Sequence, residues 1–141
     1  MRQLRDEKGA VVAVWTIGIA TLITAVLGIA VDLSGLVHAK QSAGDLAAQA
    51  ARYAGQQINT GVFMNSGRVE VQARRAKAAA VEYLEAAGMT GTATVEGGTT
   101  LVVTSRLSWT PTFLGTLGIG PLEVTATATA RVVRAHDGEE E

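Results

Sequence analysis

The sequence predicts an α+β protein: a long N-terminal helix and a second helix that cover a three-stranded antiparallel sheet. Three patterns carry this prediction. Residues 10–31 are apolar and uncharged, residues 36–58 and 69–87 place apolar side chains at three- and four-residue spacing, and residues 92–96, 100–109 and 122–132 alternate apolar with polar side chains. The 141 residues are 48% hydrophobic but only 4% aromatic, and none is cysteine. This composition excludes a disordered chain, a disulfide-stapled mini-protein and any site built on thiols.

The first element is an apolar helix long enough to cross a bilayer. Residues 10–31 read AVVAVWTIGIATLITAVLGIAV, and at about 1.5 Å per residue this helix extends roughly 33 Å. The leader at 1–9 carries three basic residues, and Lys40 is the next lysine or arginine after the run. The positive-inside rule therefore places the leader in the cytoplasm and the chain after the span outside. A secretory signal cleaved after residues 37–39 is the alternative, although its apolar region would normally cover only about 7–15 residues.

After the span the apolar pattern narrows to one stripe, which predicts that the same helix continues as an amphipathic stem. No proline occurs before Pro111, so the helix runs unbroken to the stop expected at Asn59-Thr60-Gly61. The stripe consists of Leu36, Ala39, Ala43, Leu46, Ala47, Ala50, Ala54 and Ile58.

A second helix is expected at 67–87. Asn65 or Ser66 is placed to cap its N-terminus, and Gly88 is placed to adopt the left-handed conformation just after its end. Its apolar stripe is built mainly of alanine, which favours close packing against another alanine-rich helix. The stem supplies that partner.

Strands are expected after residue 90, where the period of the apolar pattern changes from 3.6 to 2. A first strand at 92–96 leads through a two-residue hairpin turn, Gly97-Gly98, into a second strand at 100–109. The strand at 122–132 alternates most regularly. The apolar face of the second strand is formed by Leu101, Val103, Leu107 and Trp109. A sheet with one polar and one apolar face needs a helical cover, which the two helices provide.

The connection at 111–121 is rich in glycine and is expected to pack Phe113, Leu114 and Ile119 against the sheet. With it the organisation of the chain is complete. The division is a cytoplasmic basic leader at 1–9, a transmembrane helix at 10–31, an extracytoplasmic stem and α+β body at 32–133, and an acidic disordered tail at 134–141.

Four segments carry a family resemblance. A leader ending in Lys8-Gly9 before a long apolar helix resembles type IV pilins. Asp32-Leu33-Ser34-Gly35, AKQSAGDLAAQAARYA at 39–54 and FLGTLGIGPLEVTATATARVV at 113–133 are similar to segments of the TadE/TadG-like proteins of tight-adherence (Flp-type) pilus systems. The resemblance implies a pilin-like fold and a minor pilin or pilus-assembly subunit, which crosses the bacterial cytoplasmic membrane once and enters a surface pilus. The implied partners are other pilin-like subunits, the assembly machinery and the lipid bilayer.

The resemblance also implies cleavage by a prepilin peptidase between Gly9 and Ala10. Pilins carry a glutamate at the fifth position after the cut, where this chain has Val14. A buried glutamate in lipid can set the register between subunits, so its absence leaves two outcomes open. Either the leader is removed, or the helix stays as a permanent anchor. In the second case the chain is an envelope protein that binds a secretion or cell-surface partner without entering a filament.

Two features of the span are candidate interaction sites. Thr16, Ala20, Thr24 and Gly28 recur every four residues and form either a close-packing face for another membrane helix or a row produced by composition alone. Asp32, at the end of the span, either pairs with a basic residue of a neighbouring subunit or is hydrated at the outer interface.

No pattern of catalytic or ligand-binding residues occurs. His38 and His136 are far apart in the sequence and belong to no ligand motif, and the carboxylates of the tail lack an EF-hand loop. The loop with Gly115, Gly118 and Gly120 lacks the Lys-Ser/Thr of a phosphate site, and no GxSxG elbow is present. We therefore expect a non-enzyme without metal, cofactor or small-molecule substrate. The formal net charge of −1 gives no footprint for nucleic acid.

Overall fold

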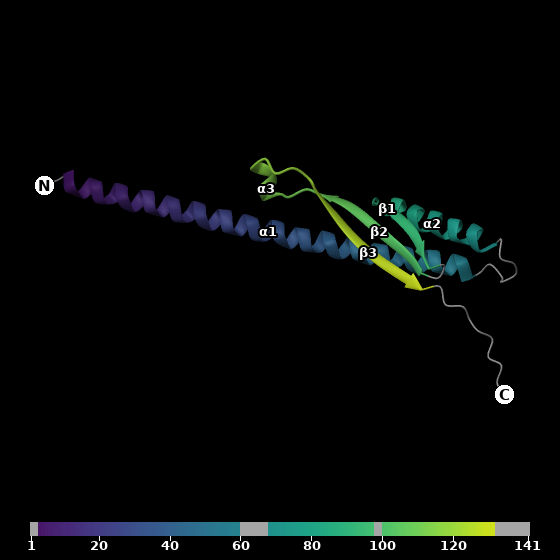
Figure 1. The fold of residues 1–141 in the computed structure, drawn as a ribbon. Coiled ribbons are helices and arrows are strands. Elements are labelled where there is room, and N and C mark those ends of the chain that lie inside the picture. Colours follow the sequence, from purple (N-terminus) through teal and green to yellow (C-terminus); the bar gives the residue numbers. More distant parts are fainter. Residues whose placement is uncertain (1–2, 60–67, 98–99, 132–141) are drawn as a thin grey trace, which may run out of the picture. The chain divides into compact units, whose positions relative to one another are not determined.

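The computed structural model describes residues 3–59, 68–97 and 100–131 (Figure 1). It confirms the α+β class, with a long N-terminal helix, further helices and a three-stranded antiparallel sheet. In chain order the elements are α1 (Gln3–Asn59), α2 (Arg68–Ala86), β1 (Thr90–Glu96), β2 (Thr100–Trp109), α3 (Phe113–Thr116) and β3 (Leu122–Arg131). The chain divides into two compact units, one of Met1–Val37 with Thr110–Pro121 and one of His38–Trp109 with Leu122–Glu141.

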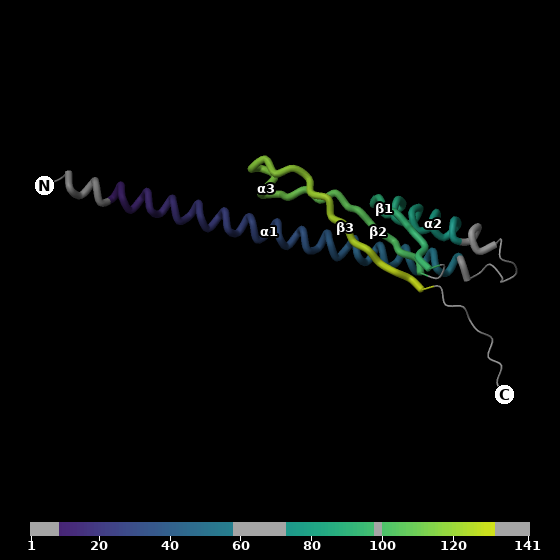
Figure 2. The backbone as a smooth tube through the Cα atoms, in the orientation of Figure 1, coloured from purple at the N-terminus to yellow at the C-terminus, as the bar shows by residue number. Residues whose placement is uncertain are grey.

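In the second unit, two helical segments cover one face of the sheet. The second half of α1 and α2 run alongside strands that follow the order β1-β2-β3 (Figure 2). The buried cluster between them consists of Ala43, Ala50, Ala51, Ala54, Ala76, Ala80, Leu84, Met89, Leu101 and Val103. Because most helical members are alanine, the backbones approach closely, and a Cβ added to Gly44 or Gly55 of α1 would lie 3.9 Å from an alanine Cβ of β3. Six of the seven helical members belong to the stripes predicted for the two helices, and Ala51 lies outside the predicted stripe.

The register of the sheet pairs large side chains on β2 with small ones on its neighbours. Leu101 lies opposite Ala130, and Val103 lies between Ala93 of β1 and Ala128 of β3. Leu101 and Val103 are fully buried. The opposite face of the sheet is polar, and the hydroxyl oxygens of Thr104 and Thr127 on it are 3.2 Å apart. This is the alternation that the sequence predicts for a sheet covered on one face.

The end of α2 matches the prediction for Gly88. This glycine has a φ of +75°, and the N–H groups of Gly88 and Met89 donate to the carbonyl oxygens of Glu85 and Leu84, each at 2.9 Å. The two bonds form a Schellman motif, in which the residue after the left-handed position packs back onto the last turn. Met89 and Leu84 are both buried. The motif therefore directs the chain from α2 into β1.

Two local predictions were wrong. The pairing of Glu96 with Thr100 leaves residues 97–99 between the strands, so the loop has three residues and not two. The glycine-rich connection is present as predicted, and it contains a one-turn helix, α3, that the sequence did not predict. Ile119, expected to pack against the sheet, is 42% exposed. Several predictions fall outside the described residues: the caps Asn65 and Ser66, the stop at Thr60-Gly61, Gly98, the side chain of Ile58, and the tail with His136.

Candidate functional site

The first half of α1 presents an apolar surface to its surroundings. In the described part of the chain it is the one helix that is long and apolar enough to cross a membrane, and none of its most apolar stretch is buried. Its exposed large hydrophobic side chains up to residue 37 are Val11, Val12, Val14, Trp15, Ile17, Ile19, Leu22, Ile23, Val26, Leu27, Ile29, Val31, Leu33 and Val37. They occur all around the helix, whereas a helix at the surface of a soluble protein keeps a polar face. An exposed apolar surface of this size indicates contact with a membrane or with another protein.

The polar side chains within this apolar stretch satisfy their own hydrogen bonds. The hydroxyls of Thr16, Thr21 and Thr24 each donate to the carbonyl oxygen four residues earlier, at 2.8, 2.9 and 2.9 Å. A hydroxyl without a partner would be costly in lipid, and this back-bonding removes that cost. The threonines are therefore compatible with apolar surroundings.

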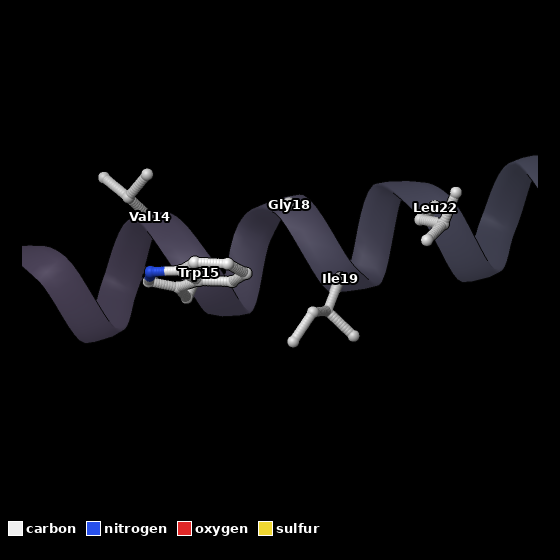
Figure 3. Close-up of a pocket in the computed structure, with 5 residues that line it drawn as sticks. All are labelled: Val14, Trp15, Gly18, Ile19 and Leu22. Carbon is white, nitrogen blue, oxygen red and sulfur yellow. The ribbon is translucent and has the colours of Figure 1, made fainter.

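A shallow pocket lies on one side of this helix, over Gly18. Val14, Trp15, Gly18, Ile19 and Leu22 line it (Figure 3). The flat Trp15 ring lies along the helix, and the side chains of Val14 and Ile19 point to opposite sides of it. A Cβ added to Gly18 would meet nothing within 4 Å. At 100° per residue, this pocket lies on the side of α1 opposite Thr16 and Ala20 of the candidate packing face.

The candidate packing face is not uniform. Thr16, Ala20 and Thr24 are exposed, but Gly28 is half-buried because the aromatic ring of Phe113 lies over it. A Cβ at position 28 would collide with three atoms of that ring. The fourth member of the row therefore contacts the same chain, and three members are left for another helix.

Asp32 accepts three hydrogen bonds from backbone groups of a distant segment of the first unit. Its Oδ1 accepts hydrogen bonds from the backbone N–H groups of Thr112, at 2.8 Å, and Phe113, at 3.1 Å. Its Oδ2 accepts one from the N–H of Leu114, at 2.6 Å. We call this arrangement the Asp32 clasp. It joins α1 to the first turn of α3 across 80 to 82 residues of sequence.

The clasp gives Asp32 an intramolecular role that the sequence did not reveal. The residue is 2% exposed, so the expectation of a hydrated carboxylate was wrong. The first N–H groups of a helix have no partner within the helix, and the side chain of Thr112 makes no capping bond. The negative carboxylate supplies the acceptor from a distant segment, with a charge that suits a helix N-terminus. Pairing of Asp32 with a neighbouring subunit stays a prediction.

The remaining candidate residues lie on the surface. Gly9, Ala10 and Val14 are exposed on α1, and a Cβ on Gly9 would meet nothing within 4 Å. His38 is exposed as well. Over the described side chains, no three histidines or carboxylates lie close enough to hold a metal ion. Comparisons of the chain with protein-family models, with curated proteins and with solved structures give no match.

Proposed function

We propose that this protein is a minor pilin or pilus-assembly subunit of the TadE/TadG-like type, held in the bacterial cytoplasmic membrane by residues 10–31. Its N-terminus lies in the cytoplasm and its body outside. The proposal rests on the difference in burial between the two parts of α1. The first part of this helix exposes many large apolar side chains, and the second part of the same helix buries six alanines in the α+β body. In a pilin-like subunit, the apolar part of the N-terminal helix packs against other subunits, and the body is exposed at the surface of the filament. A single helix that carries both the apolar stretch and part of the core suits such a subunit.

The sequence resemblance supports the same proposal from the residues themselves. It rests on the leader ending in Lys8-Gly9 and on the order of the motifs at 32–35, 39–54 and 113–133. Two of these motifs meet in the Asp32 clasp, because Asp32 belongs to the first and the N–H groups of Phe113 and Leu114 to the last. Two segments that carry the resemblance are therefore hydrogen-bonded to each other.

A second function is an anchored envelope protein that binds a secretion or cell-surface partner without entering a filament. Val14 favours it, because a valine stands where pilins carry the glutamate that sets register between subunits. This valine is 70% exposed on α1.

Processing of the leader distinguishes the two functions. We expect co-expression with the cognate prepilin peptidase to remove the nine residues MRQLRDEKG, so that mass spectrometry finds a mature N-terminus at Ala10. Gly9→Val should abolish the cut, because the peptidase must accommodate a residue without a side chain at this exposed position. Gly18→Val, in the same helix but away from the site, is the control and should leave cleavage intact. Recovery of intact Met1 from the unmodified chain would favour the permanent anchor.

A further inference from the structure

The turn between β2 and β3 exposes apolar side chains and carries no charge. Residues 110–121 read TPTFLGTLGIGP. Leu117 is 68% exposed and Ile119 is 42% exposed. Exposed leucine and isoleucine on so short a segment indicate an apolar partner.

The Asp32 clasp places this turn beside the last part of the apolar span. The ring of Phe113 lies over Gly28, which is inside the apolar run at 10–31. Gly28 precedes Asp32 by four residues, which is about 6 Å along the helix towards the centre of the span. The start of the turn, at Phe113, therefore lies alongside the last part of the apolar run.

The backbone of the turn is also suited to a membrane boundary. Three N–H groups, those of Thr112, Phe113 and Leu114, donate to Asp32. The N–H groups of Leu117 and Ile119 donate to the carbonyl of Leu114, and that of Gly118 donates to Gly115, all at 3.1 Å. Non-helical backbone exposed to lipid is not tolerated in the hydrocarbon region, so a loop of this kind belongs at the level of the headgroups, and its N–H groups need partners there. These bonds meet that requirement for six N–H groups of the turn.

We propose that residues 112–119 lie in the outer boundary between lipid headgroups and acyl chains, as a second membrane contact beside the span. The proposal rests on the membrane anchorage proposed above. We assign lipid as the occupant because the ring of Phe113 lies over Gly28, inside the apolar run, while Leu117 and Ile119 of the same short segment are exposed. In this position Asp32 keeps its charge at the lipid edge by accepting three backbone bonds, and Leu117 and Ile119 enter the bilayer.

Site-directed spin labelling of the full chain tests the proposal. The chain has no cysteine, so Leu117→Cys and Ile119→Cys each give a single labelling position. Leu22→Cys is the control inside the span, and Thr125→Cys, on the exposed polar face of β3, is the control in water. Each variant is placed at one chain per nanodisc of phosphatidylcholine and phosphatidylglycerol. Collision of the label with oxygen, which concentrates in lipid, is compared with collision with a water-soluble nickel chelate.

We expect the ratio of the two collision rates to favour oxygen at positions 117 and 119, as at position 22, and to favour the nickel chelate at position 125. If positions 117 and 119 match position 125 while position 22 stays in lipid, the turn is in water, and this inference fails although the anchor stands. If position 22 is also open to the nickel chelate, the proposed anchor fails and the inference with it. Labels at 117 and 119 that neither reagent reaches would show that protein covers the turn, which also overturns the inference.

Discussion

Asp32 occupies a position where a carboxylate is costly unless it has partners. It follows directly on a run of apolar residues, and water reaches almost none of its surface. Without Asp32, the three N–H groups that donate to it would lack partners, because they lie at the start of a short helix. The acid and the backbone donors therefore stabilise each other, and neither is tolerated alone. This mutual dependence makes Asp32 the residue that fixes the turn.

Replacing Asp32 should release the turn without unfolding the body. In Asp32→Ala, the amides of Thr112, Phe113 and Leu114 lose their acceptor, so we expect their hydrogen exchange to accelerate towards that of an unstructured segment. The amides of Leu101 and Val103, in the central strand of the other unit, should keep their protection. Asp45→Ala, which removes an exposed acid from the same helix, is the matched control and should change neither group. Unchanged exchange at residues 112–114 in Asp32→Ala would show that the clasp contributes nothing.

At the scale of elements, the packing of α2 depends on side chains that are small. Ala76 and Ala80 are fully buried against α1 and the sheet, whereas Ala78 faces outward on the same helix. Leu84 completes this surface, and its side chain fills the space above Gly91 of β1. The interface therefore has no room for added methylene groups on the inner side of α2.

Leucine substitutions at positions 80 and 78 should distinguish the effect of core packing on stability from the effect of helix propensity. Ala80→Leu inserts a large side chain into a closed interface, and overpacking of this kind costs about 1–3 kcal/mol. We expect exchange of the Leu101 and Val103 amides to accelerate by roughly 5- to 150-fold, if they exchange through global opening. Ala78→Leu is the control, because leucine and alanine have similar helix propensities and the side chain enters solvent. Equal exchange in the two variants would mean that α2 does not pack as described.

Most elements were predictable from local patterns because their apolar residues recur with the period of the structure. The end of α2 at Gly88 and the inward face of β3 followed from such patterns. Ser105 was missed because it is polar, although its alternation with Leu101 and Val103 was the available signal. It is fully buried, and its hydroxyl donates to the carbonyl of Ala43 at 2.7 Å.

The Asp32 clasp was not predictable in the same way. It joins segments 80 residues apart, and no local period encodes such a contact. The contact of Phe113 with Gly28 also gives that glycine an intramolecular reason to be small. In the candidate packing face, Gly28 therefore contacts the same chain, whereas Thr16, Ala20 and Thr24 are exposed.

At the scale of the whole molecule, α1 joins the apolar N-terminal stretch to the core of the body, so the proposed anchor and the stability of the body depend on one helix. The buried residues that its second half contributes are Ala39, Ala43, Ala47, Ala50, Ala51 and Ala54. At about 0.8 kcal/mol for each buried methyl group, these six contribute about 5 kcal/mol. The total stability of a domain is only about 5–15 kcal/mol, so the body depends on the same helix that carries the span.

Truncation should reveal this dependence. A fragment of residues 32–141 keeps the Asp32 clasp and all six alanines, and we expect it to unfold cooperatively when heated. A fragment of residues 61–141 loses the six alanines and leaves Leu101 and Val103 covered by α2 alone, so it should show no cooperative transition. The measurement is circular dichroism with temperature, checked by the dispersion of the amide NMR signals.

A third fragment distinguishes loss of the stem from loss of the clasp. Residues 38–141 retain every buried alanine of α1 but lack Asp32, so this fragment should still unfold cooperatively while the amides of Thr112 and Leu114 exchange faster than in residues 32–141. If residues 61–141 instead melt cooperatively at the same temperature as residues 32–141, the stem is dispensable and α1 serves only as an anchor. If residues 38–141 fail to fold, the body requires the clasp as well as the alanines, and Asp32 then acts on both units of the chain.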